Sequence, residues 1–188
     1  MEHLISGSGY FIYPIAVLSL VGLAITLERV LALRLARIAP DSLFEAILSG
    51  EDVPEPQANR SLLGEILAFR DEQKPSPETL RAFGIFQIGR LERGIFWIDV
   101  VVAGAPLLGL LGTVTGLVKV FSGILPGEAM PDTSVFVEGI GLALTTTILG
   151  LAAAIPALIA GSYLNRRVQV LSARLNVAVE KLAELPAK

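Results

Sequence analysis

The sequence contains no cysteine and only one histidine among its 188 residues. The absence of cysteine excludes disulfide bonds and thiolate metal sites. The chain also lacks a phosphate-binding loop that ends in Lys-Ser or Lys-Thr, a nucleophile–histidine pair and a cluster of metal-ligating side chains. We therefore expect a protein that is not an enzyme and that holds no metal ion and no cofactor.

Charge is missing where the sequence is most apolar. Residues 100–118 and 139–165 contain no Asp, Glu, Lys, Arg or His. Each run is close to or above the roughly 20 apolar residues that cross a bilayer as a helix. A third apolar stretch, residues 10–27, ends at Glu28 and Arg29. The pattern predicts an all-α integral membrane protein with three transmembrane helices in a lipid membrane.

The basic residues are unevenly distributed along the chain. Residues 1–12 and 122–138 contain no Lys or Arg, whereas residues 34–99 contain eight and residues 165–188 contain five. Basic segments next to a membrane span stay on the cytoplasmic side. We therefore predict that the N-terminus and the 122–138 loop lie outside and that both basic segments lie in the cytoplasm. The net charge of -3 favours no nucleic-acid partner.

The cytoplasmic segments are predicted to be long helical extensions of the spans. After the third span, apolar residues from Leu164 to Leu185 recur at alternating spacings of four and three. This spacing predicts a helix that continues past the membrane and packs on other helices. The predicted organisation is an outer N-terminus and first transmembrane helix (1–33), a cytoplasmic helical segment (34–99), a second transmembrane helix (100–121), a short outer loop (122–138), a third transmembrane helix (139–164) and a cytoplasmic helical tail (165–188).

Small residues form a stripe in each charge-free span. They are Gly109, Gly112 and Gly116 in the second span, and Ala143, Thr146, Gly150 and Ala154 in the third. Faces of small residues let helix backbones approach closely. Two interpretations remain open, which are packing between helices of one chain and a pore-lining or partner-facing surface in an oligomer.

Each charge-free span also contains a proline, Pro106 in the second and Pro156 in the third. Proline removes a backbone donor, so we expect Pro156 to bend its helix unless a neighbour satisfies the freed carbonyl. A kink that only serves packing and a hinge that widens a pore are both compatible with this position.

Two segments resemble the motifs of a known family. Residues 104–121, GAPLLGLLGTVTGLVKVF, resemble the second-helix motif of the MotA/TolQ/ExbB proton-channel family, and residues 139–157, GIGLALTTTILGLAAAIPA, resemble its third-helix motif. The similarity is closest to the ExbB/TolQ branch. It implies a multi-pass protein of the bacterial inner membrane that self-associates as a ring, typically a pentamer, around a single-span partner of the ExbD/TolR type.

The resemblance also implies a mechanism. An aspartate on the partner helix takes up and releases protons, and the proton-motive force then drives work on an envelope protein such as TonB or TolA. Thr113 matches the second-helix threonine that faces the pore, and Thr147 matches the third-helix threonine beside the partner aspartate. Pro106 and Pro156 match the motif prolines. An alternative for both hydroxyls is a hydrogen bond back to a carbonyl of their own helix.

One position departs from the family pattern. Many ExbB and TolQ proteins have a glutamate three residues after the first glycine of the third-helix motif, where this chain has Leu142. Glu138 is an alternative acidic group, four residues before Leu142 and nearer the outer end of the proton path. It is either an entry group for protons or an acid that is favoured near a helix N-terminus by the helix dipole. Two other functions stay open, namely a non-conducting membrane scaffold and a MotA-like flagellar stator subunit.

Overall fold

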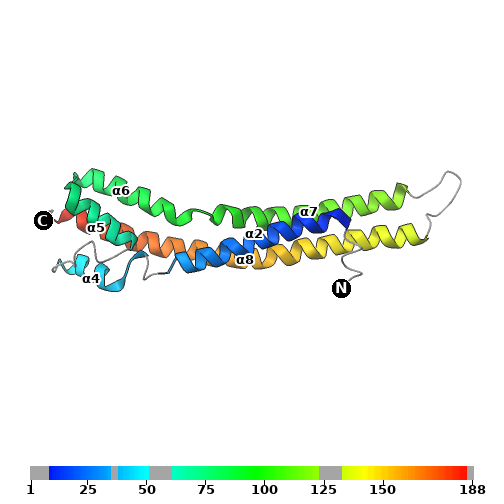
Figure 1. Ribbon diagram of the computed structural model, residues 1–188, viewed down its shortest axis with the longest axis horizontal. Helices are drawn as coiled ribbons and strands as arrows, with labels where there is room; N and C mark the ends of the chain where they lie inside the picture. The colour runs from blue at the N-terminus through cyan, green and yellow to red at the C-terminus, as the bar shows by residue number, and fades with distance from the viewer. Residues whose placement is uncertain (1–8, 35–37, 51–60, 123–132, 186–188) are drawn as a thin grey trace. The chain divides into compact units, whose positions relative to one another are not determined.

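The computed structural model describes residues 9–34, 38–50, 61–122 and 133–185 (Figure 1). Every regular element in these ranges is a helix, so the all-α prediction is confirmed for this part of the chain. The elements are η1 (Gly9–Phe11), α2 (Ile12–Ala32), α4 (Asp41–Ser49), α5 (Leu62–Gln73), α6 (Pro77–Gly89), η3 (Arg90–Glu92), α7 (Ile95–Ser122) and α8 (Thr133–Glu184).

Three helical segments are long and apolar enough to cross a membrane. They are Ile12–Ala32, Pro77–Ser122, which includes α6, η3 and α7, and Thr133–Glu184. The prediction of three membrane-capable helices is therefore confirmed. The helices extend beyond the predicted spans, because the apolar runs predict the part inside the bilayer and not the end of the hydrogen-bonded helix.

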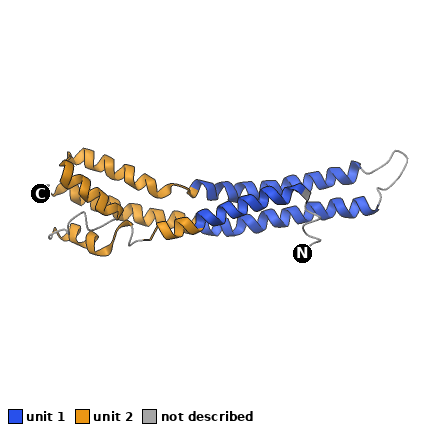
Figure 2. Cartoon of the chain, in the orientation of Figure 1, with its two compact units in different colours: residues 1–26, 96–161 blue, residues 27–95, 162–188 orange. Residues whose placement is uncertain are grey.

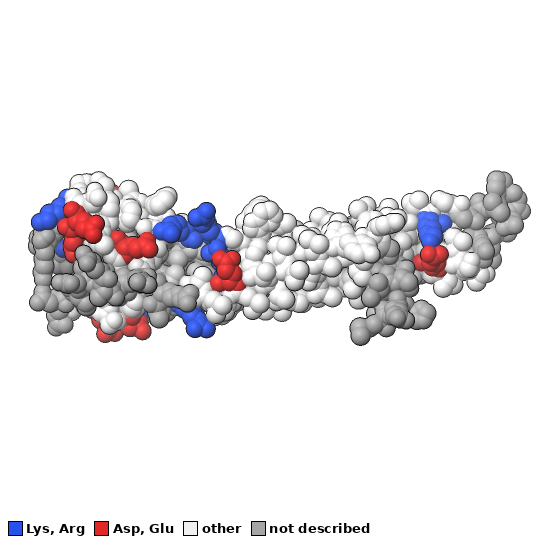
Figure 3. Space-filling view, in the orientation of Figure 1, with Lys and Arg blue, Asp and Glu red and all other residues white. Residues whose placement is uncertain are grey.

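The chain forms two compact units. Unit 1 comprises residues 1–26 and 96–161, and unit 2 comprises residues 27–95 and 162–188 (Figure 2). On the face drawn in Figure 3, acidic and basic side chains gather on unit 2, whereas unit 1 shows an almost continuous uncharged surface. The charge segregation read from the sequence therefore coincides with the structural division.

Unit 1 is built from α2, α7 and the first part of α8. The helix α2 approaches α7 at a glycine, because a Cβ added to Gly22 would lie 3.1 Å from Val101 Cγ2. Ile15, Ile98 and Ala105 are buried in this unit. Pro106 and Pro156 both lie inside continuous helices. The bend expected at Pro156 remains a prediction.

Unit 2 is held together by the apolar seam along the second part of α8. Leu164, Val168, Leu171, Leu175, Ala178 and Leu182 are all buried, which confirms the packing predicted from their heptad-like spacing. The helix α6 packs on this part of α8 at Gly84, where an added Cβ would lie 2.8 Å from Val179 Cγ2. The rings of Phe69 and Phe83 stack between α5 and α6, with centroids 4.1 Å apart.

Local sequence explains where the unit 2 helices begin. Ser61 caps α5 by accepting a hydrogen bond from the Gly64 amide at 3.0 Å, and Ser76 caps α6 by accepting one from the Thr79 amide at 3.3 Å. Pro77 follows as the first residue of α6, where its missing amide costs least. The start of α6 at Pro77 therefore follows from the local sequence.

Candidate functional site

The charge-free parts of α7 and α8 meet backbone to backbone. A Cβ added to Gly109 would lie 2.9 Å from the carbonyl oxygen of Thr146, and one added to Gly150 would lie 2.5 Å from that of Ala105. About two turns nearer the end of α7, a Cβ on Gly139 would lie 2.7 Å from the carbonyl oxygen of Gly116. Side chains larger than hydrogen do not fit at these positions, so the glycines set the distance between the helices.

Thr146 sits in the middle of this contact. Its side chain is fully buried and fills the space opposite Gly112. The hydroxyl oxygen lies 2.8 Å from the carbonyl oxygen of Leu142 and 3.3 Å from that of Gly109, so the hydroxyl can donate to either helix. The side chain is therefore a polar bridge between α7 and α8 within one chain.

The residues predicted to be pore-lining or partner-facing lie in this internal contact. The glycines Gly109, Gly112, Gly116 and Gly150 face the other helix of the same chain, and Ala143, Thr146 and Ala154 are buried. Within one chain these small residues let the backbones of α7 and α8 approach closely, which is the packing interpretation. Their role as a pore or partner surface in an oligomer remains a prediction.

The two threonines matched to the family motifs are only partly buried. Thr113 Oγ1 donates to the Leu110 carbonyl oxygen at 2.6 Å, and Thr147 Oγ1 donates to the Ala143 carbonyl oxygen at 3.2 Å. Both hydroxyls therefore donate back to their own helix in this chain. Each oxygen keeps lone pairs that can accept a further hydrogen bond, from a protonated acid or from water. Their role in proton passage remains a prediction.

Thr113 and Thr147 both lie near Gly109, where α7 and α8 are in contact. Thr147 Oγ1 also lies 3.5 Å from the Gly109 carbonyl oxygen, and Thr113 is four residues along α7 from Gly109. Thr115, by contrast, donates to the Leu111 carbonyl oxygen at 2.9 Å and is exposed. It therefore offers a matched hydroxyl on the same helix that is more exposed than Thr113.

Glu138 has a partner that the sequence analysis missed. Lys119 Nζ lies 2.6 Å from Glu138 Oε1, and the two side chains are 44% and 60% exposed. Glu138 lies five residues after Thr133, where the described part of α8 begins. The ion pair joins α7 to α8, and the dipole and proton-entry interpretations both remain predictions. Opposite charges on either side of a short connection were the available signal.

The apolar runs of these two helices contain no acidic or basic side chain. Residues 100–118 and 139–165 have no Asp, Glu, Lys, Arg or His, and Leu142 takes the place of the family glutamate. Among the described residues, no group of three or more His, Cys, Asp or Glu side chains could hold a metal ion. A proton-carrying carboxylate at this depth would have to belong to another chain.

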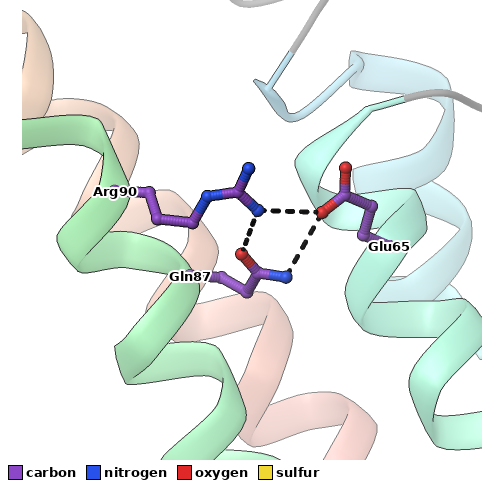
Figure 4. Close-up of polar contacts among 3 residues, drawn as sticks. All are labelled: Glu65, Gln87 and Arg90. Carbon is purple, nitrogen blue, oxygen red and sulfur yellow. Dashed lines mark hydrogen bonds and ion pairs between the residues drawn. The ribbon is translucent and has the colours of Figure 1, made fainter. Parts of the chain in front are cut away.

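A second polar cluster, also missed from the sequence, lies in unit 2 (Figure 4). Arg90 Nη1 lies 2.7 Å from Gln87 Oε1 and 3.3 Å from Glu65 Oε2. Gln87 Nε2 donates to the same carboxylate oxygen at 3.2 Å, and Gln87 is 4% exposed. The three side chains join α5 to the end of α6. A glutamine within the apolar stripe of α6 was the signal that this position is buried and bonded.

Comparison with known proteins places these features in a family. Residues 57–177 match the MotA/TolQ/ExbB proton channel family. The chain is 32% identical over 165 residues to the putative biopolymer transport protein ExbB-like 1 of Synechocystis sp., covering 80% of this chain and 65% of that protein. It is 39% identical over 87 residues to the biopolymer transport protein ExbB of Helicobacter pylori, covering 46% and 59% respectively.

The similarity extends to a Tol protein. The Tol-Pal system protein TolQ of Pseudomonas aeruginosa is 28% identical over 202 residues, covering 93% of this chain and 87% of that protein. The chain spans less than two thirds of the length of the two ExbB relatives, 65% and 59%. The matched region includes α5, α6, α7 and most of α8.

Proposed function

Because this chain belongs to the MotA/TolQ/ExbB proton channel family, we propose that it is an ExbB/TolQ-like subunit of a proton-motive-force-driven motor in the bacterial inner membrane. In this proposal several copies, most simply five, form a ring around an ExbD/TolR-like single-span protein. The ring and its partner energise an envelope transport process through a TonB- or TolA-like protein.

The proposed topology follows the distribution of charge. The N-terminus and residues 122–138 lie outside, and residues 34–99 and 165–188 lie in the cytoplasm, where Lys and Arg accumulate. The side chains of unit 2, including α4, α5 and α6, then form the cytoplasmic part of the subunit. The charge-free parts of α7 and α8 cross the bilayer.

The observation that carries the proposal is the pairing of partly exposed hydroxyls with charge-free, closely packed helices. An ionised carboxylate inside a membrane is costly and needs polar neighbours. Thr113 and Thr147 supply such neighbours without a permanent charge, because a hydroxyl can donate to a carboxylate and accept from its acid form. This chain then contributes the threonine hydroxyls along the proton path, and the partner contributes the carboxylate that takes up and releases the proton.

The tight contact of α7 and α8 supports a path on the outside of this helix pair. At Gly109, Gly116 and Gly150 the two backbones already approach too closely for an added Cβ. A water file between these helices of one chain has no room at these levels. The path is completed, in this proposal, where Thr113 and Thr147 meet other chains.

The proposal is tested by co-expressing the chain with a single-span, aspartate-bearing partner and measuring the mass of the purified complex by native mass spectrometry. A closed ring that captures the partner supports the proposal, provided that vesicles holding the complex also take up protons. A monomer or dimer that ignores the partner contradicts it. An assembled ring without proton uptake would instead favour the non-conducting scaffold.

A further inference from the structure

The helix α6 has one face that packs inside unit 2 and one that does not. Leu80, Gly84 and Gln87 are buried on the inner face. On the outer face, Ile85 and Phe86 are both 68% exposed, although each is a large apolar side chain. Exposed apolar side chains that gather on one face mark a surface that contacts something else.

This outer face continues into a surface pocket of about 580 Å³. Ile85, Phe86, Gly89, Arg90 and Arg93 line it, and both of the charged residues among them are arginines. The space next to Gly89 is open, because a Cβ added there would meet nothing within 4 Å. Apolar side chains beside cations are the composition of segments that lie on a membrane surface.

The two arginines are held differently. Arg90 is fixed by Glu65 and Gln87, which bind its Nη1, while its side chain stays 48% exposed. Arg93 is exposed and forms no ion pair with any residue that the structure describes. A guanidinium suits the bidentate recognition of phosphate.

The position of the pocket along the chain gives the source of that phosphate. Gly94, with φ of 84°, lies in the turn between η3, which ends at Glu92, and α7, which begins at Ile95. The uncharged run begins at residue 100, seven residues after Arg93 in the sequence. Trp97 lies between them and is 54% exposed, as is typical of tryptophan at the membrane–water interface.

We propose that this pocket binds the headgroup of an anionic phospholipid in the cytoplasmic leaflet, with the phosphate on the guanidinium groups of Arg90 and Arg93. Ile85 and Phe86 then rest on the membrane surface. The inference rests on the proposed cytoplasmic side of residues 34–99, but neither on ring formation nor on proton conduction. In this inference the pocket at the end of α6 contacts lipid and anchors unit 2 at the bilayer.

The chain carries its own probe, because Trp97 is the only tryptophan. The full chain is reconstituted in phosphatidylcholine vesicles that contain an equal small fraction of either dibrominated phosphatidylglycerol or dibrominated phosphatidylcholine. Bromine quenches nearby tryptophan fluorescence. We expect phosphatidylglycerol to quench Trp97 several-fold more effectively than phosphatidylcholine. The Arg93→Gln variant should lower this preference by about fivefold, as expected for one basic residue at an anionic surface.

Two matched variants control for charge and for folding. Lys74→Gln removes the same charge from the exposed end of α5 and should keep the preference, and Arg93→Lys should keep most of it. Equal quenching by the two lipids, or an unchanged preference in Arg93→Gln, overturns the inference. So does loss of the preference on adding millimolar glycerol phosphate, which would identify a site for soluble phosphate. Native mass spectrometry of the same samples reports ring formation separately, so the two proposals can fail independently.

Discussion

Thr146 occupies the space that a side chain on Gly112 would need. A Cβ added to Gly112 would lie 2.7 Å from Thr146 Cγ2, and closer still to its Cβ and Oγ1. The threonine is fully buried, and its hydroxyl lies within hydrogen-bonding distance of carbonyl oxygens on both α7 and α8. A glycine on one helix and a threonine on the other thus form a matched pair that sets how α7 and α8 pack.

Replacing Gly112 with alanine should therefore destabilise the helix pair. The added methyl group meets a β-branched side chain that cannot move aside, so we expect the free energy of unfolding to fall by about 2 kcal/mol. Thermal denaturation of the detergent-purified chain measures the change.

The matched control is Gly141→Ala, because a Cβ at Gly141 meets nothing within 4 Å. It should leave the denaturation midpoint nearly unchanged. Adding Thr146→Gly to Gly112→Ala should recover part of the loss, since the two side chains compete for one space. Equal effects of the two alanine variants would contradict this account of the contact.

Replacing both Thr113 and Thr147 with valine should remove proton-driven activity while the complex still assembles. Valine keeps the shape of threonine and loses only the hydroxyl. A hydrogen bond to a charged group is worth about 1.5–3 kcal/mol, so we expect at least about a tenfold loss of rate for each hydroxyl. Proton uptake by vesicles that hold the chain and its partner is the measurement.

Thr115→Val is the control for this experiment, because Thr115 is exposed and its hydroxyl donates to Leu111 on its own helix. It should keep most of the rate. A double variant of Thr113 and Thr147 with full activity would refute the proposed role of the hydroxyls.

The Lys119–Glu138 ion pair should contribute little to stability, because both side chains are substantially exposed. Exposed pairs are worth about 0–1 kcal/mol and are screened by salt. We expect Lys119→Gln and Glu138→Gln to lower the denaturation temperature slightly at low salt and less at high salt. The charge-swapped double variant should recover the loss.

The same variants test the alternative that Glu138 admits protons at the outer mouth. A structural ion pair predicts that Lys119→Gln and Glu138→Gln affect proton uptake alike. A loss of uptake in Glu138→Gln alone would favour a direct role for its carboxylate.

Gln87→Ala should destabilise unit 2 through the cluster in Figure 4. The substitution removes the hydrogen bonds to Glu65 and Arg90 at a buried position, so we expect a loss of about 1–2 kcal/mol. Chemical denaturation followed by circular dichroism measures it. Gln73→Ala, at the exposed end of α5, is the control and should have no measurable effect. Equal losses would show that the cluster adds nothing.

Much of the helical organisation could be predicted because it depends on local composition. Leu164, Leu171 and Leu175 are buried as their spacing indicated, since a period of 3.5 places apolar residues on one helix face whatever packs there. The start of α6 at Pro77 was predictable for a similar reason. Ser76 and Pro77 satisfy the requirements of a helix N-terminus locally.

The contents of the candidate site could be predicted only in part. The motif matches selected Thr113 and Thr147, and the structure places both near the level where α7 and α8 meet. Gly112 and Thr146 pack against each other within one chain, and their interpretation as a pore or partner surface remains a prediction. Periodicity says which residues share a helix face, but it does not say which helix faces them.

The sequence by itself determined that the described parts of the chain are helical, that three segments can cross a membrane and that two of them have long runs without Asp, Glu, Lys, Arg or His. These properties follow from transfer free energies and helical period, which act residue by residue. Only the tertiary structure decided that Gly112 meets Thr146, that Lys119 pairs with Glu138 and that Arg90 is bound by Glu65. Each of these depends on the distance between segments remote in sequence, and that distance is set by packing.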